Sequence, residues 1–142
     1  MRPQSIPGIL ETVLYCPDLA AAQAFYTGVL GLALHSTSGE RHVFLRCGGA
    51  MLLLFNPEST SGVPVAVEGA VIPRHGARGP GHLGFRASLG EIDAWRDHLR
   101  DHGVAIEADI EWPGGGRSIY FRDPAGNSLE FVTPEMWGLE RP

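Results

Sequence analysis

The sequence predicts an α+β fold in which two βαβββ modules form a curled, cup-shaped mixed sheet with the helices on its outside. The order of one strand, one helix and three short strands occurs in residues 9–55 and again in residues 81–133. The 19 glycines and 11 prolines divide the chain into short elements, which favours strands over long helices. Each module has one apolar sheet face for its helix, so the two sheets can join at their edges and line a cup with their other faces.

The first module begins with a strand over Ile9–Tyr15, which is rich in apolar and β-branched residues and ends at Cys16-Pro17. Asp18 is placed to cap a helix that runs to about Leu30, because apolar residues recur there every three or four positions. Three further strands complete the module at residues 33–36, 42–46 and 51–55.

Residues 56–80 are rich in proline and glycine and have no clear period, so we expect a linker loop between the modules. In the second module, a strand over His82–Ala87 precedes a helix in which Ser88 and Glu91 have the spacing of a capping box. Strands are then predicted at residues 104–110, 117–122 and 128–133, and residues 134–142 form a C-terminal tail. At 142 residues, the chain has the length of a single domain.

Composition excludes several classes of function. The net charge of −5 argues against a nucleic-acid partner, and the absence of lysine excludes a Schiff-base or P-loop lysine. The longest unbroken apolar run has six residues, Ala50–Phe55, which is too short to span a membrane. Cys16 and Cys47 lack the paired spacing of a disulfide framework, so we expect reduced thiols and a cytoplasmic protein.

The alternation of side chains along the last strand of the second module indicates which residues face the cup. Leu129 and Phe131 belong to the helix side, so Glu130 faces the opposite way. In the strand HLGFRA the same argument turns His82 toward the cup, and Arg86 shares its face.

In the first strand, Leu10 and Leu14 are assigned to the core, so Glu11 also faces the cup. Burying two carboxylates is costly unless a cation or hydrogen bonds compensate, and the sequence has no lysine to supply the charge. We therefore predict a divalent metal held by Glu11, His82 and Glu130.

Three segments of the chain resemble the vicinal oxygen chelate superfamily, the group of glyoxalases, bleomycin-resistance proteins and extradiol dioxygenases. They are ILETVLYCPDLAAAQAFYTGVLGL, GPGHLGFRA and YFRDPAGNSLEF. The resemblance implies ligands on the first strand of each module and on the last strand of the second, here Glu11, His82 and Glu130. The first of these positions is often histidine in dioxygenases and in fosfomycin-inactivating members. Glyoxalases place a fourth ligand where this chain has Leu53.

The resemblance also implies a function and further site residues. We expect a metal-dependent lyase or isomerase that chelates neighbouring oxygens of a small substrate on Zn, Mn, Ni or Fe, with Glu11 as general base. Fosfomycin-type relatives hold substrate on the strand before the DPxGN turn, which points to Ser118 and to Tyr120, the latter also a candidate catalytic residue. Arg86 is a candidate for binding an anionic substrate, and a homodimer is expected.

Two alternatives stay open. The first is a ring-cleaving iron dioxygenase, which needs two histidines and one carboxylate, so His75 from the linker would have to join His82. The second is a metal-free binding protein of the bleomycin-resistance type, which sequesters a small molecule in a dimer groove.

Overall fold

The computed structural model describes residues 1–3 and 5–139, so the end of the predicted tail, residues 140–142, lies outside the described residues. The chain divides into two compact units, Met1–Ala77 and Arg78–Pro142. Each unit contains one β-α-β-β-β arrangement around a four-stranded mixed sheet, which confirms the predicted α+β class and the repeated module. That the two modules make one cup-shaped domain stays a prediction.

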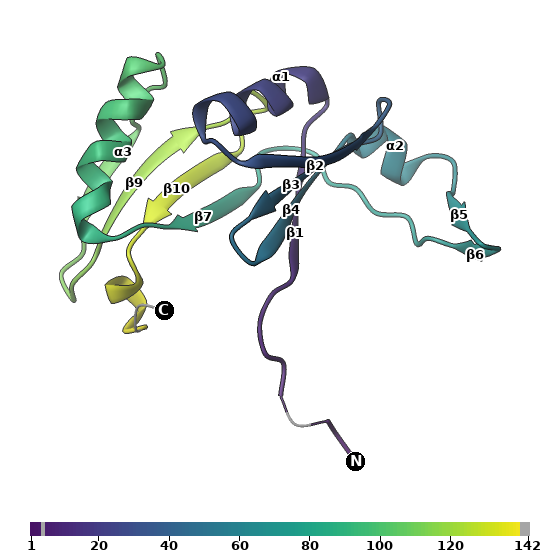
Figure 1. Cartoon of the computed structure of the whole chain (residues 1–142), viewed down its shortest axis with the longest axis horizontal. Coiled ribbons are helices and arrows are strands. Elements are labelled where there is room, and N and C mark those ends of the chain that lie inside the picture. Colours follow the sequence, from purple (N-terminus) through teal and green to yellow (C-terminus); the bar gives the residue numbers. More distant parts are fainter. Residues whose placement is uncertain (4, 140–142) are drawn as a thin grey trace. The chain divides into compact units, whose positions relative to one another are not determined.

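The first unit contains β1 (Glu11–Tyr15), α1 (Leu19–Ala24), a π-helical segment η1 (Phe25–Val29), β2 (Ala33–Ser38), β3 (His42–Cys47), β4 (Ala50–Phe55), α2 (Pro57–Ser61), β5 (Ala66–Val67) and β6 (Ala70–Val71). The strand order is β1-β4-β3-β2, in which β1 runs parallel to β4 and the other neighbours are antiparallel (Figure 1). The parallel pair requires the crossover that α1 and η1 provide.

The predicted cap of α1 is present, since the Asp18 carboxylate accepts a hydrogen bond from the Ala21 N–H at 3.0 Å.

The sheet of the first unit has one face packed against α1, and the helix does not cover the other face. The side facing the helix carries the most buried apolar side chains, Leu14, Val43, Leu45, Leu52 and Leu54. By alternation, Glu11, Val13 and Leu53 lie on the other face.

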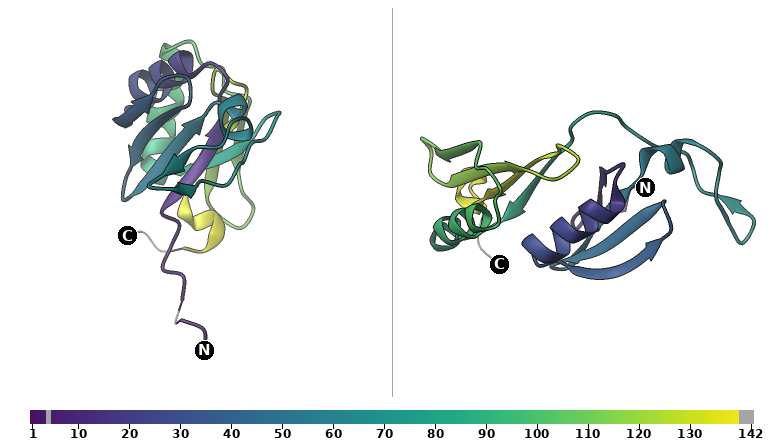
Figure 2. Two further views of the ribbon diagram at one scale, coloured as in Figure 1. Left: turned by 90° about the vertical axis from the view of Figure 1, so that its right-hand side faces the viewer. Right: turned by 90° about the horizontal axis from the view of Figure 1, so that it is seen from above.

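Two expectations for this unit were wrong. Leu10 is 72% exposed instead of buried, since it precedes the first paired residue of β1, Glu11, although its carbonyl still accepts a hydrogen bond from the Met51 N–H at 2.8 Å. Residues 56–80 are also not a plain loop: Asn56 caps α2, Pro57 occupies its first turn, and the β5–β6 hairpin projects away from the main sheet of its unit (Figure 2). The Asn-Pro pair was the available signal for this helix.

The second unit contains β7 (His82–Arg86), α3 (Leu89–Asp101), β8 (Ala108–Glu111), β9 (Arg117–Arg122), β10 (Ser128–Val132) and a 3-10 segment η2 (Pro134–Trp137). The strand order β7-β10-β9-β8 repeats that of the first unit, with β7 parallel to β10. The strand expected from residue 104 begins only at Ala108.

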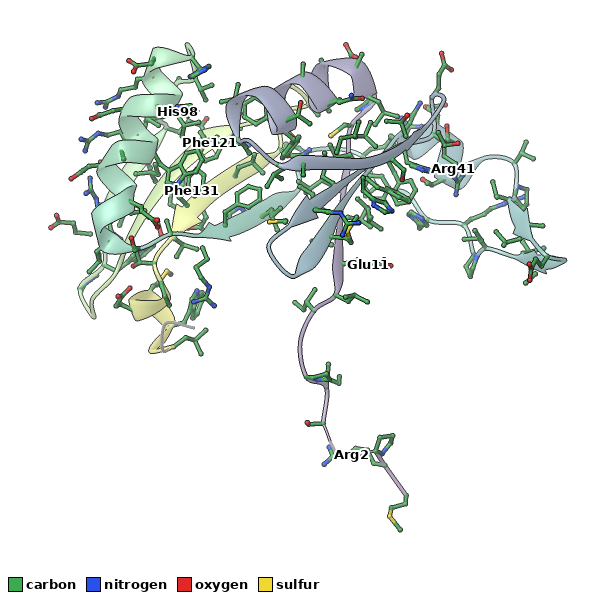
Figure 3. The ribbon with its side chains drawn as sticks, viewed as in Figure 1. Arg2, Glu11, Arg41, His98, Phe121 and Phe131 are labelled. Carbon is green, nitrogen blue, oxygen red and sulfur yellow. The ribbon has the colours of Figure 1, made fainter. Side chains whose placement is uncertain are left out.

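Helix α3 forms as the sequence predicts. In the capping box, the Glu91 carboxylate accepts a hydrogen bond from the Ser88 N–H at 2.8 Å. Trp95 of α3 stacks on Phe131 with ring centroids 4.3 Å apart. Phe121 and Phe131 accordingly lie beside α3 (Figure 3), on the sheet face opposite Glu130.

Arg117 joins three elements of the second unit. Its guanidinium donates to both carboxylate oxygens of Asp109 on β8, at 2.9 and 2.8 Å, and to Asp93 of α3 at 2.8 Å. The hydrogen bond from Arg117 is the main cause that lowers the pKa of Asp109. The network thus ties α3 to the far edge of the sheet.

We expect Arg117→Met to lower the free energy of unfolding at neutral pH by about 1 kcal/mol through the Arg117–Asp109 pair, a value already reduced for solvent screening. Because the folded-state pKa of Asp109 is lowered, this contribution is present above the unfolded pKa of about 3.9 and is lost as pH falls through the folded value. Denaturant unfolding at pH 7 and at pH 2 measures the difference, which should shrink at pH 2. Arg122→Met, on a more exposed ion pair with Glu107, is the control and should cost less.

None of the helices formed by the described residues has the length and apolar character needed to cross a membrane. Cys16 is buried and Cys47 is half-buried, and neither is in a disulfide within the described part of the chain, as predicted.

Candidate functional site

His82 and Glu130 meet on the face of the second sheet that α3 does not cover. Ser128 pairs with His82 across the parallel β7–β10 ladder, and Glu130 lies two residues further along β10 on the same face. The distance from His82 Nε2 to Glu130 Oε1 is 3.0 Å. The structure thus brings together two of the three predicted metal ligands, from positions 48 residues apart in the sequence.

The second ring nitrogen of His82 is fixed by the backbone. Nδ1 lies 2.9 Å from the carbonyl oxygen of Ser128, and a carbonyl can only accept, so Nδ1 carries a proton. Nε2 points toward the Glu130 carboxylate, and in a neutral imidazole with its proton on Nδ1 it would present a lone pair. Two lone pairs at this distance repel unless a proton or a cation lies between them. A backbone carbonyl on the outer nitrogen is also the arrangement that orients metal-binding histidines.

Glu130 is nearly buried, with 9% of its surface exposed. Its Oε2 atom is buried and has no hydrogen-bond partner among residues 1–3 and 5–139. An unsatisfied buried carboxylate oxygen is costly, and a bound cation would remove the cost. These observations fit a metal held by His82 and Glu130.

The absence of a side chain at Gly84 leaves room for the side chain of Glu130. A Cβ atom at Gly84 would lie 3.2 Å from Glu130 Cγ and 3.3 Å from Glu130 Oε1. Gly84 is not among the predicted site residues, although a glycine in a strand interior often marks a close approach of another group.

We expect Gly84→Ala to weaken metal binding about tenfold, because Glu130 must shift by a few tenths of an ångström to accept the methyl group. Calorimetric titration with Zn²⁺, Mn²⁺ or Ni²⁺ measures the effect. The matched control is Gly90→Ala in the first turn of α3, where an added Cβ meets nothing within 4 Å. Equal affinities for both variants would show that Gly84 has no part in placing the carboxylate.

Tyr120 lies opposite Glu130 in the antiparallel β9–β10 ladder, and its ring lies 6.2 Å from that of His82, centroid to centroid. Burial, the charge of Glu130 and a hydrogen bond with Glu130 raise the pKa of Tyr120, in this order, and a hydrogen bond with Ser118 opposes them. The phenol therefore keeps its proton at neutral pH. Ser118, two residues before Tyr120 on β9, is fully buried, and its Oγ accepts a hydrogen bond from Trp112 Nε1 at 2.9 Å. Trp112 is not among the residues predicted for the site from the sequence.

The remaining candidate residues occupy separate places. Arg86 is exposed on β7, on the same strand face as His82. Glu11 is exposed at the start of β1 in the first unit (Figure 3), and Leu53 lies on the same face of that sheet. Within the described residues, no three His, Cys, Asp or Glu side chains gather as a metal site. That Glu11 completes the ligand set stays a prediction.

His75 lies in the first unit, where its Nδ1 atom is 2.6 Å from the Tyr15 hydroxyl. The dioxygenase alternative required this histidine as a metal ligand. With Nδ1 engaged by Tyr15, only Nε2 remains for any other partner.

Comparison with protein families shows to which superfamily the chain belongs. A family profile described as the Glyoxalase/Bleomycin resistance protein/Dioxygenase superfamily matches residues 8–131. The chain belongs to this superfamily. The match confirms the resemblance to vicinal oxygen chelate proteins that the sequence indicates.

Several solved structures have a fold similar to that of this chain. A structure of lactoylglutathione lyase from Agrobacterium tumefaciens is 41% identical, covers 96% of this chain and 100% of its own, and has a TM-score of 0.90. A glyoxalase/bleomycin resistance protein/dioxygenase from Nocardioides is 27% identical over 92% of this chain and 85% of its own, with a TM-score of 0.67. A fosfomycin resistance protein from Listeria monocytogenes, at 20% identity over 91% and 94% of the two chains and a TM-score of 0.67, shares the fold. A search of curated proteins found no match.

Proposed function

We propose that this vicinal oxygen chelate protein is a divalent-metal-dependent lyase of the glyoxalase type that acts on lactoylglutathione or a related thioester. The observation that carries the proposal is the His82–Glu130 pair, in which Nε2 lies 3.0 Å from the carboxylate oxygen Oε1 while the Ser128 carbonyl fixes Nδ1. The similarity to a lactoylglutathione lyase over 96% of the chain supports the choice of substrate.

His82, Glu130 and Glu11 would hold the metal, which leaves open coordination positions because Leu53 stands where a fourth ligand is expected. When bound, the metal supplies Lewis-acid polarisation of two neighbouring substrate oxygens. The near burial of Glu130 favours retention of the cation, because the carboxylate is costly without it.

Glu11 is the proposed general base. In the direction of thioester formation, it takes the proton from the carbon that bears sulfur and returns it to the neighbouring carbon, so no redox partner is needed. Its exposed position at the start of β1 leaves the carboxylate free to move between two carbons.

Tyr120 is a proposed substrate-binding donor. Its raised pKa keeps the phenol protonated, so the hydroxyl can donate to a substrate oxygen beside Glu130. Ser118, held by Trp112, positions Tyr120. Arg86 is the proposed partner for an anionic group of the substrate, since it shares a strand face with His82.

The test begins with elemental analysis of protein purified without chelator, followed by assays of thioester formation and cleavage with lactoylglutathione on the metal-loaded and chelator-stripped forms. We expect activity only in the loaded form. A protein that binds no divalent ion would favour the metal-free binding alternative. A loaded protein that consumes oxygen with catechols and leaves the thioester intact would favour the dioxygenase.

A further inference from the structure

Five aromatic side chains form a cluster on the first unit, on the sheet face opposite α1. We call Tyr15, His42, Phe44, Phe55 and His75 the aromatic cluster. His42 stacks on Phe44 with centroids 3.7 Å apart and planes 8° from parallel. Phe55 meets both rings edge to face, at 5.8 and 5.4 Å. All but Phe55 are only half-buried, so part of the cluster remains exposed.

His75 is fixed in this cluster by three contacts, although most of its neighbours in the chain are exposed. Its backbone N–H donates to the Thr60 carbonyl at 3.2 Å. Its ring meets Phe55 edge to face at 5.0 Å, and Nδ1 lies 2.6 Å from the Tyr15 hydroxyl. The structure thus holds one histidine of the exposed 71–81 segment firmly against the sheet.

The Tyr15 contact sets the tautomer of His75. Burial raises the pKa of Tyr15, so the phenol is protonated at neutral pH and donates to Nδ1. A neutral imidazole that accepts at Nδ1 carries its proton on Nε2. His75 therefore offers one oriented N–H donor.

A positive charge lies beside the aromatic cluster. The Arg41 guanidinium lies 5.7 Å from the centroid of Phe55, in a cation–π contact. Burial and the charge of Arg41 lower the pKa of His42, so this imidazole is neutral. Its Nδ1 atom is buried and has no hydrogen-bond partner in the part of the chain that the structure describes. Flat apolar surface, oriented nitrogen atoms and a nearby guanidinium together suit a planar apolar group that carries a carboxylate.

We propose that the aromatic cluster is a specificity subsite that binds a planar, apolar, anionic part of the substrate, with His75 donating from Nε2 and Tyr15 acting as its positioning residue. The link to turnover rests on the proposed function. Glu11 and Tyr15 lie on the same face of β1 four residues apart, about 13 Å along a strand. The substrate would then be a thioester related to lactoylglutathione that carries a planar, anionic group well beyond its reacting carbons.

The experiment uses metal-free full-length protein, so that binding does not depend on the proposed reaction. The probe is 2-naphthoate, followed by calorimetry and by NMR shifts of the aromatic cluster, with cyclohexanecarboxylate as the non-planar comparison. We expect 2-naphthoate to shift the resonances of Tyr15, Phe44 and His75 and to bind at least about tenfold more tightly than the comparison acid.

His75→Leu is expected to raise the Kd for 2-naphthoate about tenfold, and Tyr15→Phe, which keeps the ring, by a smaller factor of about three. Tyr15→Phe keeps the test decisive if His75→Leu disturbs the 71–81 segment. The control is His35→Leu on exposed β2, which should leave the Kd unchanged.

Unchanged Kd values in both variants, or naphthoate shifts confined to other residues, would overturn the proposal. If the metal-loaded wild-type protein had no lyase activity but the metal-free protein still bound 2-naphthoate, the result would count against the proposed function alone.

Discussion

Glu130→Gln is expected to make the metal-free protein as stable as the wild type or more stable, and at the same time to abolish the stabilisation that metal provides. In the wild type, Glu130 Oε1 lies 3.0 Å from His82 Nε2, and the buried Oε2 atom has no hydrogen-bond partner among the described residues. Glutamine removes the nearly buried charge, and its N–H can donate to His82 Nε2, so the contact is kept as a neutral hydrogen bond. Metal at 100 times its Kd should stabilise the wild type by about 2.7 kcal/mol and the variant by nearly nothing.

Thermal or denaturant unfolding with and without Zn²⁺, Mn²⁺ or Ni²⁺ measures both effects. His82→Ala should lose metal affinity by more than about 100-fold, with little change in the stability of the metal-free protein, because the imidazole is 52% exposed. His35→Ala, at an exposed histidine of β2, is the control and should leave the metal affinity unchanged. If Glu130→Gln responded to metal like the wild type, Glu130 would not be a ligand.

Glu11→Gln is expected to separate metal binding from turnover. The amide oxygen can still coordinate, whereas the amide cannot take up a proton, so kcat should fall by at least about 100-fold while metal content changes much less. The measurement is thioester formation by protein whose metal content has been determined in the same sample. Glu40→Gln, in the turn between β2 and β3, is the matched control.

Two outcomes would contradict this role. Full turnover by the metal-loaded Glu11→Gln protein would show that Glu11 is not the base. Complete loss of metal would show that Glu11 acts as a fixed ligand instead.

Sequence pattern predicted most elements of the second module closely, β8 excepted, because the signals for the others are local. The Ser88–Glu91 capping box and the alternation around Glu130 each involve residues within a few positions of one another. The prediction for Leu10 was wrong for the opposite reason. Alternation indicates the face of a residue only within a paired strand, and the pairing of β1 starts at Glu11.

Contacts over long sequence separations could not be predicted in the same way. The linker histidine His75 meets Tyr15 from 60 positions away, and the pattern of neither segment indicates the other. The fit of Gly84 under Glu130 likewise depends on the register between β7 and β10.

The amino-acid sequence by itself determined the repeated module, the superfamily and the sheet face on which His82 and Glu130 lie, because strand periodicity is a local property. Only the tertiary structure decided that β10 lies between β7 and β9, and this order places Glu130 between His82 and Tyr120. The same packing placed a backbone carbonyl on His82 Nδ1 and left Glu130 Oε2 without a hydrogen-bond partner among the described residues. Strand order and register depend on the packing of the whole sheet, which no single segment of sequence encodes.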